Sequence, residues 1–154
     1  MSQNSAMTQH NDPWQSYRKV TVQTAPPEQL VLMLYDGAIS FLERGLAGFD
    51  HSDPLKFNQT INNNVLRAQA IIYDMNARLD MQKGGEIAEN FRRIYGYYYS
   101  RLQEGNLKKK KSPLEEVLGY LRGLREAWAE MLRNRHGAGA DSEATPAGPD
   151  IRLA

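Results

Sequence analysis

The chain of 154 residues contains no cysteine, so disulfide bonds and thiolate chemistry are excluded and a reducing compartment is the simplest fit. It has no excess of charge: 19 basic residues stand against 18 acidic ones, and no global field points to nucleic acid as a partner. It also lacks an apolar segment of about 20 residues, the length that spans a bilayer. Residues 1–12 are polar and have no apolar signal-peptide core, which predicts a cytosolic protein without membrane insertion.

Histidine is scarce as well, and its positions remove the usual catalytic and metal-binding arrangements. His10, His51 and His136 are all predicted to lie in loops or tails. None stands one helical turn from a carboxylate that would complete a zinc or di-iron site, and no predicted helix face gives a serine a histidine base. Gly84 and Gly85 lack the strand–turn–helix context of a phosphate loop. We therefore expect no enzyme, no metal site and no cofactor.

What the chain does have is a broad apolar helical stretch from Leu30 to Leu42. At about 100° per residue, polar side chains such as Asp36 and Ser40 fall on one narrow stripe, and apolar side chains fill most of the remaining arc. This arc exceeds the roughly 100° that a helix needs to face one core. Such a helix is either central in a bundle or half-covered by another molecule, so the stretch is the first indication of a bound protein.

Four predicted helices with short connections give an all-α fold, an antiparallel four-helix bundle with a short N-terminal arm and disordered tails. Thr24 is expected to cap the first helix and Asp53 the second, while Gly105 and Asn106 are expected to end the third. Strand-like alternation and repeats of solenoid period are absent from the sequence. The helices are expected at about 26–48, 54–81, 86–104 and 113–135, in one domain of residues 13–135 between disordered residues 1–12 and 136–154.

Each of the later helices has an apolar stripe that we expect to face the core. Tyr97 and Tyr99 fall off the stripe of the third helix, so aromatic side chains are also expected on its surface. Lys108–Lys111 is expected to be a solvated connection rather than a polyanion site, because no clustered basic or stacking aromatic residues accompany it. The expected stripes are Ile61, Val65, Ala68, Ile72, Met75 and Leu79; Ile87, Phe91, Ile94, Tyr95, Tyr98 and Leu102; and Leu114, Val117, Leu118, Leu121, Leu124, Trp128 and Leu132.

An apolar and aromatic arm precedes the first helix. Trp14, Tyr17, Val20 and Val22 lie in a segment too short to be a stable helix alone. Its composition leaves two roles open, a strap over the edge of the core or a part of a binding site. Because tyrosine gives large contact area at low entropy cost, the broad arc and the extra tyrosines together predict a bundle that binds a peptide in apolar grooves.

Several stretches, taken in order, resemble one family, the flagellar secretion chaperones known as FliS. The resemblance spans about residues 17–131 and rests on the combined order and spacing of its blocks. The chain departs from the family pattern at Pro26, Gly96 and Gly105, where members usually have Ser, Asp and Ala. The matching blocks are Tyr17 with Val20 and Val22, then Thr24–Leu30, Met33–Ala38, Gly84–Asn90, Tyr95 through Leu102, Asn106–Lys108 and Leu124–Trp128.

This resemblance implies a cytosolic bundle that binds the carboxy-terminal segment of flagellin, keeps it unpolymerised and delivers it to the type III export gate. It implies that Tyr17 occupies part of the groove when flagellin is absent, and that some members bind regulatory proteins of flagellar assembly. The empty protein is expected to be a monomer or a weak homodimer. The residues expected in the flagellin groove or its lid are Tyr17, Val20, Val22, Leu32, Met33, Tyr35, Ile39 and Leu46.

Two other functions stay open at this point. One is a helical regulatory protein that sequesters a transcriptional or translational controller, which would share the fold and an apolar groove. The other is a plain structural bundle that dimerises through the apolar arc of Leu30–Leu42. The bound partner separates the first two functions, because the chaperone co-purifies with flagellin and the regulator with a small controller. The plain bundle predicts a dimer that peptide does not disturb.

Overall fold

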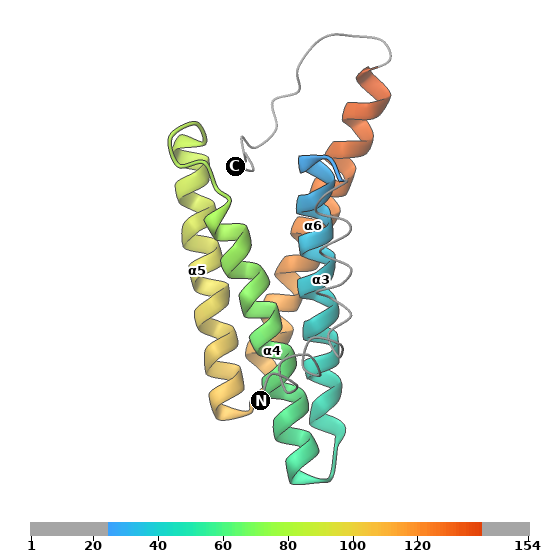
Figure 1. The fold of residues 1–154 in the computed structure, drawn as a ribbon, viewed down its shortest axis with the longest axis vertical. Helices are drawn as coiled ribbons and strands as arrows, with labels where there is room; N and C mark the ends of the chain where they lie inside the picture. The colour runs from blue at the N-terminus through green and yellow to red at the C-terminus, as the bar shows by residue number, and fades with distance from the viewer. Residues whose placement is uncertain (1–24, 140–154) are drawn as a thin grey trace, which may run out of the picture.

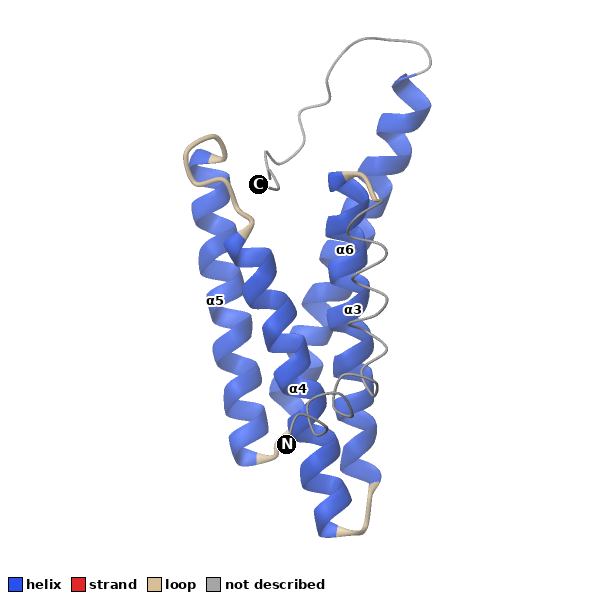
Figure 2. Cartoon of the chain, in the orientation of Figure 1, coloured by secondary structure: helices blue, strands red, loops and turns tan. Residues whose placement is uncertain are grey.

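The computed structural model describes residues 25–139, and residues 1–24 and 140–154 lie outside the described part. The predicted N-terminal arm and most of the predicted disordered tails therefore fall outside it. Within the described range the chain is helical and has no strand, which confirms the all-α prediction (Figure 2). The elements in chain order are α3 (Pro27–Ala47), the 3₁₀ turn η1 (Gly48–Asp50), α4 (Pro54–Ala77), α5 (Gly85–Lys108) and α6 (Lys111–Gly139).

The four helices form an antiparallel bundle in which each helix packs against two others. α3 contacts α4 and α6, and α5 contacts the same two helices from the other side. Figure 1 shows successive helices running in opposite directions, and it shows α5 and α6 close together at their connection but diverging toward the opposite end. This divergence matters for the site, because the apolar stripes of two neighbouring helices then meet along only part of their length.

The starts of the first two helices show two ways of dealing with the free backbone N–H groups of a first helical turn. Asp53 caps α4 as predicted: its carboxylate accepts a hydrogen bond from the backbone N–H of Lys56 at 3.2 Å, and Pro54 is the first helical residue. Thr24, the predicted cap of the first helix, lies outside the described residues, and α3 has Pro26 at its N-cap without a side-chain cap. Pro26 and Pro27 bring no backbone N–H groups and fix φ near the helical value, so less capping is needed there.

Replacing Asp53 by alanine is expected to lower the free energy of unfolding by about 1 kcal/mol, the usual value of an N-cap side chain. The reason is that the N–H of Lys56 loses its carboxylate acceptor at the start of α4. Urea unfolding followed by circular dichroism measures the change. Asp50→Ala, which removes a carboxylate from the neighbouring turn η1, is the matched control and is expected to shift stability by less than about 0.5 kcal/mol. Equal losses in the two variants would contradict the capping role.

The predicted end of the third helix is wrong by one turn. α5 continues through Gly105 and Asn106 to Lys108, and the left-handed residue that ends it is Lys109, with φ of 51°. Gly105 is buried against the start of α6. Glycine is needed there because a Cβ would not fit against α6, and not because the backbone has a positive φ. The Lys109 ammonium compensates in part for the strained backbone, because it donates to the carbonyl of Asn106 at 2.7 Å and so caps the helix.

The observed boundaries of α4 and α6 also differ from the predicted ones. α4 ends at Ala77 rather than near 81, and the following turn still buries Leu79. α6 is longer than predicted at both ends, since it begins at Lys111 and reaches Gly139. Lysine is a good helix former, so Lys111 joins the helix although it belongs to a run of charges. The predicted disorder of residues 136–139 is corrected accordingly.

The predicted core stripes are largely confirmed. The whole stripe of α4 is buried, and so is that of α6 except for Leu124, which is half-buried. The stripe of α5 is buried only in its second half: Tyr95, Tyr98 and Leu102 are inside, whereas Ile87 is 43% exposed and the prediction for it is wrong. The physical reason is the divergence of α5 from α6, which leaves the first turns of α5 without α6 as a neighbour on that side (Figure 1).

Candidate partner-binding surface

Three of the predicted groove residues form a line along α3. Leu32, Ile39 and Leu46 are spaced seven residues apart, so they lie on one side of the helix. All three are half-buried and pack against the core from its edge. Met33 is half-buried too, but it stands about 100° further round the helix and so belongs to another side. The apolar arc of α3 is therefore used by more than one neighbour.

Ion pairs show that α6 covers the side of α3 next to this line. The guanidinium of Arg125 donates to the carboxylate of Asp36 at 2.8 Å, and that of Arg122 donates to Glu43 at 2.6 Å. The hydrogen bond to Asp36 raises the pKa of Arg125. Asp36 is thus a surface hydrogen-bond partner of α6. α6 therefore faces the side of α3 that carries Asp36 and Glu43, next to the line of Leu32, Ile39 and Leu46.

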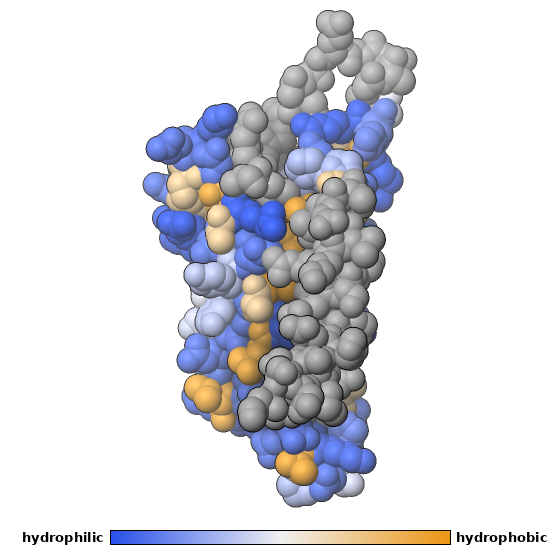
Figure 3. All heavy atoms as spheres, viewed as in Figure 1, coloured by the Kyte–Doolittle hydropathy of each residue, from blue (hydrophilic) through white to orange (hydrophobic). Residues whose placement is uncertain are grey.

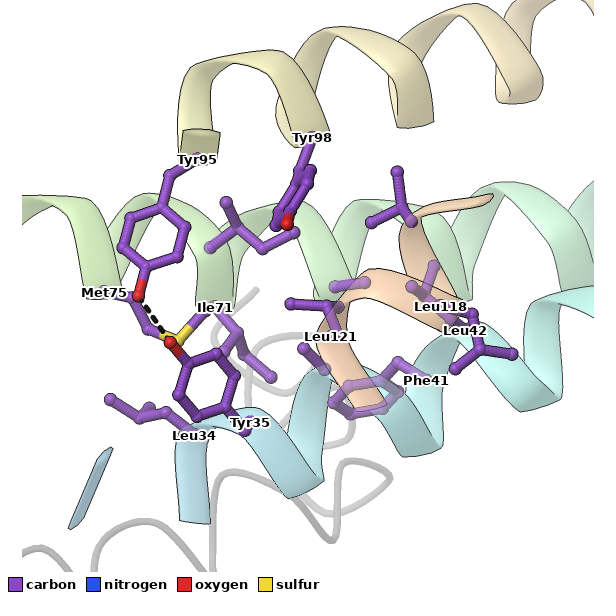
Figure 4. Close-up of a cluster of buried hydrophobic side chains, with 14 of the residues drawn as sticks. Leu34, Tyr35, Phe41, Leu42, Ile71, Met75, Tyr95, Tyr98, Leu118 and Leu121 are labelled. Carbon is purple, nitrogen blue, oxygen red and sulfur yellow. Dashed lines mark hydrogen bonds between the residues drawn. The ribbon is translucent and has the colours of Figure 1, made fainter. Parts of the chain in front are cut away.

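Tyr35 belongs to the core, which corrects its prediction as a groove residue. Its side chain is 1% exposed, and its hydroxyl shares a hydrogen bond of 2.7 Å with the hydroxyl of Tyr95. Figure 4 shows the two rings pointing toward each other from α3 and α5, with Met75 and Ile71 beside them. Burial raises the pKa of both hydroxyls. Sequence reasoning missed this pairing because the two tyrosines lie 60 residues apart.

A second tyrosine cluster ties α5 to α6 near their connection. The rings of Tyr98 and Tyr120 stack with centroids 5.6 Å apart and an interplanar angle of 12°. The Tyr97 hydroxyl donates to Glu116 at 2.6 Å, and Arg101 donates to the same carboxylate at 2.8 Å. Burial is the main cause that raises the pKa of Tyr98 to about 12. These contacts fix the distance between the two helices at the end where they are close.

Beyond this cluster, apolar side chains line the diverging halves of α5 and α6. On α6, Leu124 and Met131 are half-buried and pack against the core from its rim. On α5, the half-buried residues Phe91 and Ile94 do the same, and Ile87 continues the line toward solvent. We call Ile87, Phe91, Ile94, Tyr120, Leu124 and Met131 the α5–α6 strip. The strip lies on the halves of α5 and α6 that diverge from each other, so its apolar side chains are only partly covered by the bundle itself.

Several exposed apolar residues were not predicted from the sequence. Leu66 and Tyr73 on α4, Leu107 on α5 and Tyr120 on α6 are between 50% and 75% exposed, whereas Tyr97 and Tyr99 are surface residues as predicted. Figure 3 shows apolar residues, in orange, along the middle of α4 and near the lower ends of α4 and α5. A signal was available, since Leu66 and Tyr73 fall opposite the stripe of α4 at a spacing of seven residues.

The lysine run is tied to its own surroundings in the structure. Lys108 pairs with Glu104 at 3.5 Å, Lys109 caps α5, and the ammonium of Lys111 lies 5.9 Å from the ring centroid of Phe49. These contacts give three of the four lysines a structural role at one end of the bundle. The prediction that all four lysines form a connection is corrected, because Lys108 ends α5 and Lys111 begins α6, which leaves only Lys109 and Lys110 between the helices.

The described residues hold no constellation that would bind a metal ion, since no group of three His, Cys, Asp or Glu side chains comes together between residues 25 and 139. In the same range, no helix is long and apolar enough to span a membrane. Tyr17, Val20 and Val22, which were predicted to form a lid, lie outside the described residues. What the geometry offers is an all-α bundle with apolar side chains along its rim, and the class of protein that it defines is the helical bundle.

Comparisons with known proteins place the chain within this class. The profile of the family described as "Flagellar protein FliS" matches residues 10–135. A "Flagellar secretion chaperone FliS" from Bacillus subtilis is 32% identical over 132 residues, which covers 83% of this chain and 95% of that protein. Proteins of the same name from Salmonella typhimurium and Vibrio cholerae are 34% and 29% identical, over 75% and 79% of this chain and 87% and 90% of their own lengths. The chain belongs to the FliS family of flagellar secretion chaperones.

Proposed function

We propose that this protein is a cytosolic export chaperone that binds the carboxy-terminal segment of flagellin. In this role it prevents premature filament polymerisation and delivers the subunit to the flagellar type III export apparatus. The observation that carries the proposal is the α5–α6 strip, an apolar surface on a bundle of a chaperone family. The protein acts by binding alone, without catalysis, a cofactor or nucleic acid.

The α5–α6 strip suits a helical or extended apolar segment. Its members stand on two helices that diverge, so a ligand chain lying between them would complete the missing part of the bundle. A segment that folds on binding loses conformational freedom, and this ordering penalty keeps affinity moderate and release possible. Such a ligand fits a chaperone that must give up its cargo at the export apparatus.

The residues of α3 are kept as a second part of the proposed binding surface. Leu32, Met33, Ile39 and Leu46 are half-buried, so each still presents apolar surface beside the core. The arm that contains Tyr17, Val20 and Val22 precedes α3 directly in the chain. We propose that the arm is a reversible lid over part of this surface, since covering an apolar patch lowers the hazard of self-association.

Replacing Ile87 by glutamate is expected to weaken binding of a flagellin carboxy-terminal peptide at least tenfold, because a charge then stands at the open end of the α5–α6 strip. Isothermal titration calorimetry measures the dissociation constant. Ile87 is already 43% exposed, so folding should be retained. The matched control is Leu66→Glu, which puts the same charge on a half-exposed leucine of α4 and should leave affinity within about twofold.

The same calorimetric titration with the flagellin peptide is carried out on the variants Leu32→Asp and Ile39→Asp, which test the surface of α3. Normal binding by a folded Ile87→Glu variant would remove the α5–α6 strip from the proposal, and weakened binding by a folded Ile39→Asp variant would place the contact on α3. Purification of the tagged protein from motile cells then tests the function itself. Recovery of a small regulator in place of flagellin would favour the regulatory alternative.

Replacing Tyr17 by alanine is expected to raise the affinity for the same peptide by about threefold, because a lid that competes with the ligand lowers apparent affinity by the fraction of closed protein. Deletion of residues 1–19 should raise affinity more and promote self-association of the empty protein. Calorimetry on the wild type and the two variants gives the sign of the change. Weaker binding in both would mean that Tyr17 contacts flagellin directly, and an unchanged constant would reject both roles.

A further inference from the structure

The last helix brings the carboxy-terminal segment of the chain to the open end of the α5–α6 strip. Tyr98 and Tyr120 stack on each other, so they mark one level of the two helices. From that level α5 extends thirteen residues back to Gly85, whereas α6 continues for nineteen residues to Gly139. α6 therefore passes the start of α5 by about six residues, or about 9 Å. Figure 1 shows that α6 ends at the end of the bundle where α5 and α6 diverge.

The segment that follows α6, residues 140–154, has an apolar pair within reach of the strip. Ile151 and Leu153 are its only large apolar side chains, and eleven residues separate Ile151 from the end of α6. An extended chain of that length spans at most about 40 Å. On α6, Met131 and Leu124 lie eight and fifteen residues before that end, about 12 Å and 22 Å along the helix. A tail that turns back along α6 therefore reaches both.

The residue pattern of this tail suits an extended chain on an apolar surface. Successive side chains of an extended chain point to opposite sides, so Ile151 and Leu153 would share one side and Arg152 would take the other. Pro146 and Pro149 disfavour a helix, because each lacks a backbone N–H and restricts the residue before it to extended conformations. An apolar pair on one side and a cation on the other match the strip, which is apolar toward the protein and open to water on its other side.

Arg93 stands at the edge of the strip and has a neutral hydrogen-bond partner. It directly precedes a strip residue on α5, and its guanidinium donates to the side-chain amide oxygen of Asn90. Among the described residues, Arg93 forms no ion pair. The tail carries Asp150 directly before Ile151, so a docked tail brings a carboxylate to the side of the strip where this cation stands.

We propose that residues 140–154 fold back onto the α5–α6 strip and occupy it in the empty protein. Ile151 and Leu153 then contact the apolar side chains of the strip, and Asp150 pairs with Arg93. Because the tail is tethered, its effective concentration is of the order of millimolar, so even a weak contact fills the strip in part. A flagellin segment must displace the tail, and the tail returns when the cargo leaves. This competition rests on the proposed function, whereas the docking of the tail does not.

A nitroxide label on the tail tests the docking in the full-length protein. The chain has no cysteine, so Ala154→Cys gives a single attachment site next to the apolar pair. In methyl NMR spectra the nitroxide should broaden the signals of Ile94 and Met131, which belong to the strip. The signals of Leu55 should stay sharp, because α4 begins at the other end of the bundle. Absence of broadening at the strip would overturn the proposal.

Charges on the tail show which residues dock. Adding Ile151→Glu and Leu153→Glu to the labelled protein should remove the broadening, because carboxylates lose their hydration on an apolar surface. The matched control is Ala144→Glu/Ala147→Glu, which adds the same charges to a part of the tail without large apolar side chains and should keep the broadening. Broadening that survives the first pair of changes would overturn the proposal. If a nitroxide at Ser16→Cys broadened the strip signals instead, the occupant would be the N-terminal arm, and the proposal would be wrong.

Calorimetry with the flagellin carboxy-terminal peptide measures the competition. Without the label, Ile151→Glu/Leu153→Glu should raise the affinity about threefold, as expected if the tail fills the strip in about two-thirds of the empty molecules. Ala144→Glu/Ala147→Glu should bind like the wild type. A docked tail with an unchanged dissociation constant would overturn the competition, since flagellin would then bind outside the strip. If the peptide bound none of these proteins, the proposed function would fail, while the docking would still be decided by the NMR result.

Discussion

Replacing Gly105 by valine is expected to lower the free energy of unfolding by about 3 kcal/mol, the upper range for overpacking a core. Gly105 lies in the last turns of α5, where α6 begins. An added Cβ would overlap the Cδ1 atom of Leu114 and would stand 3.2 Å from both the Lys110 carbonyl oxygen and the Cβ of Pro113. Leu114 is fully buried, so its side chain has no free space into which to move.

Thermal and urea unfolding measure this loss, which corresponds to a drop of roughly 10 °C in Tm. The matched control is Gly119→Val on the exposed side of α6, where an added Cβ meets nothing within 4 Å. That change should alter stability by less than about 0.5 kcal/mol, because valine is slightly better than glycine in a helix. In a Leu114→Ala background, Gly105→Val should lower the free energy of unfolding by less than it does in the wild type. An equal loss in both backgrounds would show that Leu114 is not the obstacle.

The second large effect is expected at the buried pair of Tyr35 and Tyr95. Each hydroxyl has the other as its hydrogen-bond partner at 2.7 Å, inside the core. Tyr35→Phe leaves the Tyr95 hydroxyl buried without this partner, which should cost about 2 kcal/mol, and Tyr95→Phe should cost a similar amount. The double variant should cost clearly less than the sum of the two, because no hydroxyl of the pair is then left unpaired. Strictly additive losses in urea unfolding would contradict the direct bond.

The same pair predicts how stability depends on alkaline pH. Burial raises the pKa of both hydroxyls in the folded protein above the value of about 10 that tyrosine has in an unfolded chain. Their contribution is therefore fully present below about pH 10 and is lost as pH rises through the raised folded values. Unfolding measured between about pH 8 and 11 should show a steeper loss in the wild type than in the double phenylalanine variant. Because Tyr98 has a pKa of about 12, the stability of the wild type and of the double variant will both keep some dependence on alkaline pH.

The stripes that the sequence placed correctly are those where helical period alone decides burial. Ile61, Val65, Ala68, Ile72 and Met75 repeat every three or four residues, and all are buried. Such spacing puts apolar side chains on one side of a helix whatever the partner, so a core position follows from local geometry. The cap of α4 was predictable for the same reason, because a cap involves only residues a few positions apart in the chain.

The errors fall where a distant segment decides the outcome. Gly105 has the sequence signature of a helix end, but its role is set by Leu114 and Pro113, which reach it only after α6 folds back. Ile87 is spaced like a core residue and is exposed, because α5 diverges from α6 at that level. Tyr35 was read as surplus apolar surface, but a partner 60 residues away completes its burial.

The helical class, the four helices and the family blocks could all be predicted before the structure was known, because helical period, turn residues and short-range order are properties of neighbouring residues. The position of the α5–α6 strip was set by the tertiary structure. The strip exists because two helices diverge after the Tyr98–Tyr120 contact. It does not follow from local spacing, since a surface shared by two helices depends on their relative rotation and angle, which only packing fixes.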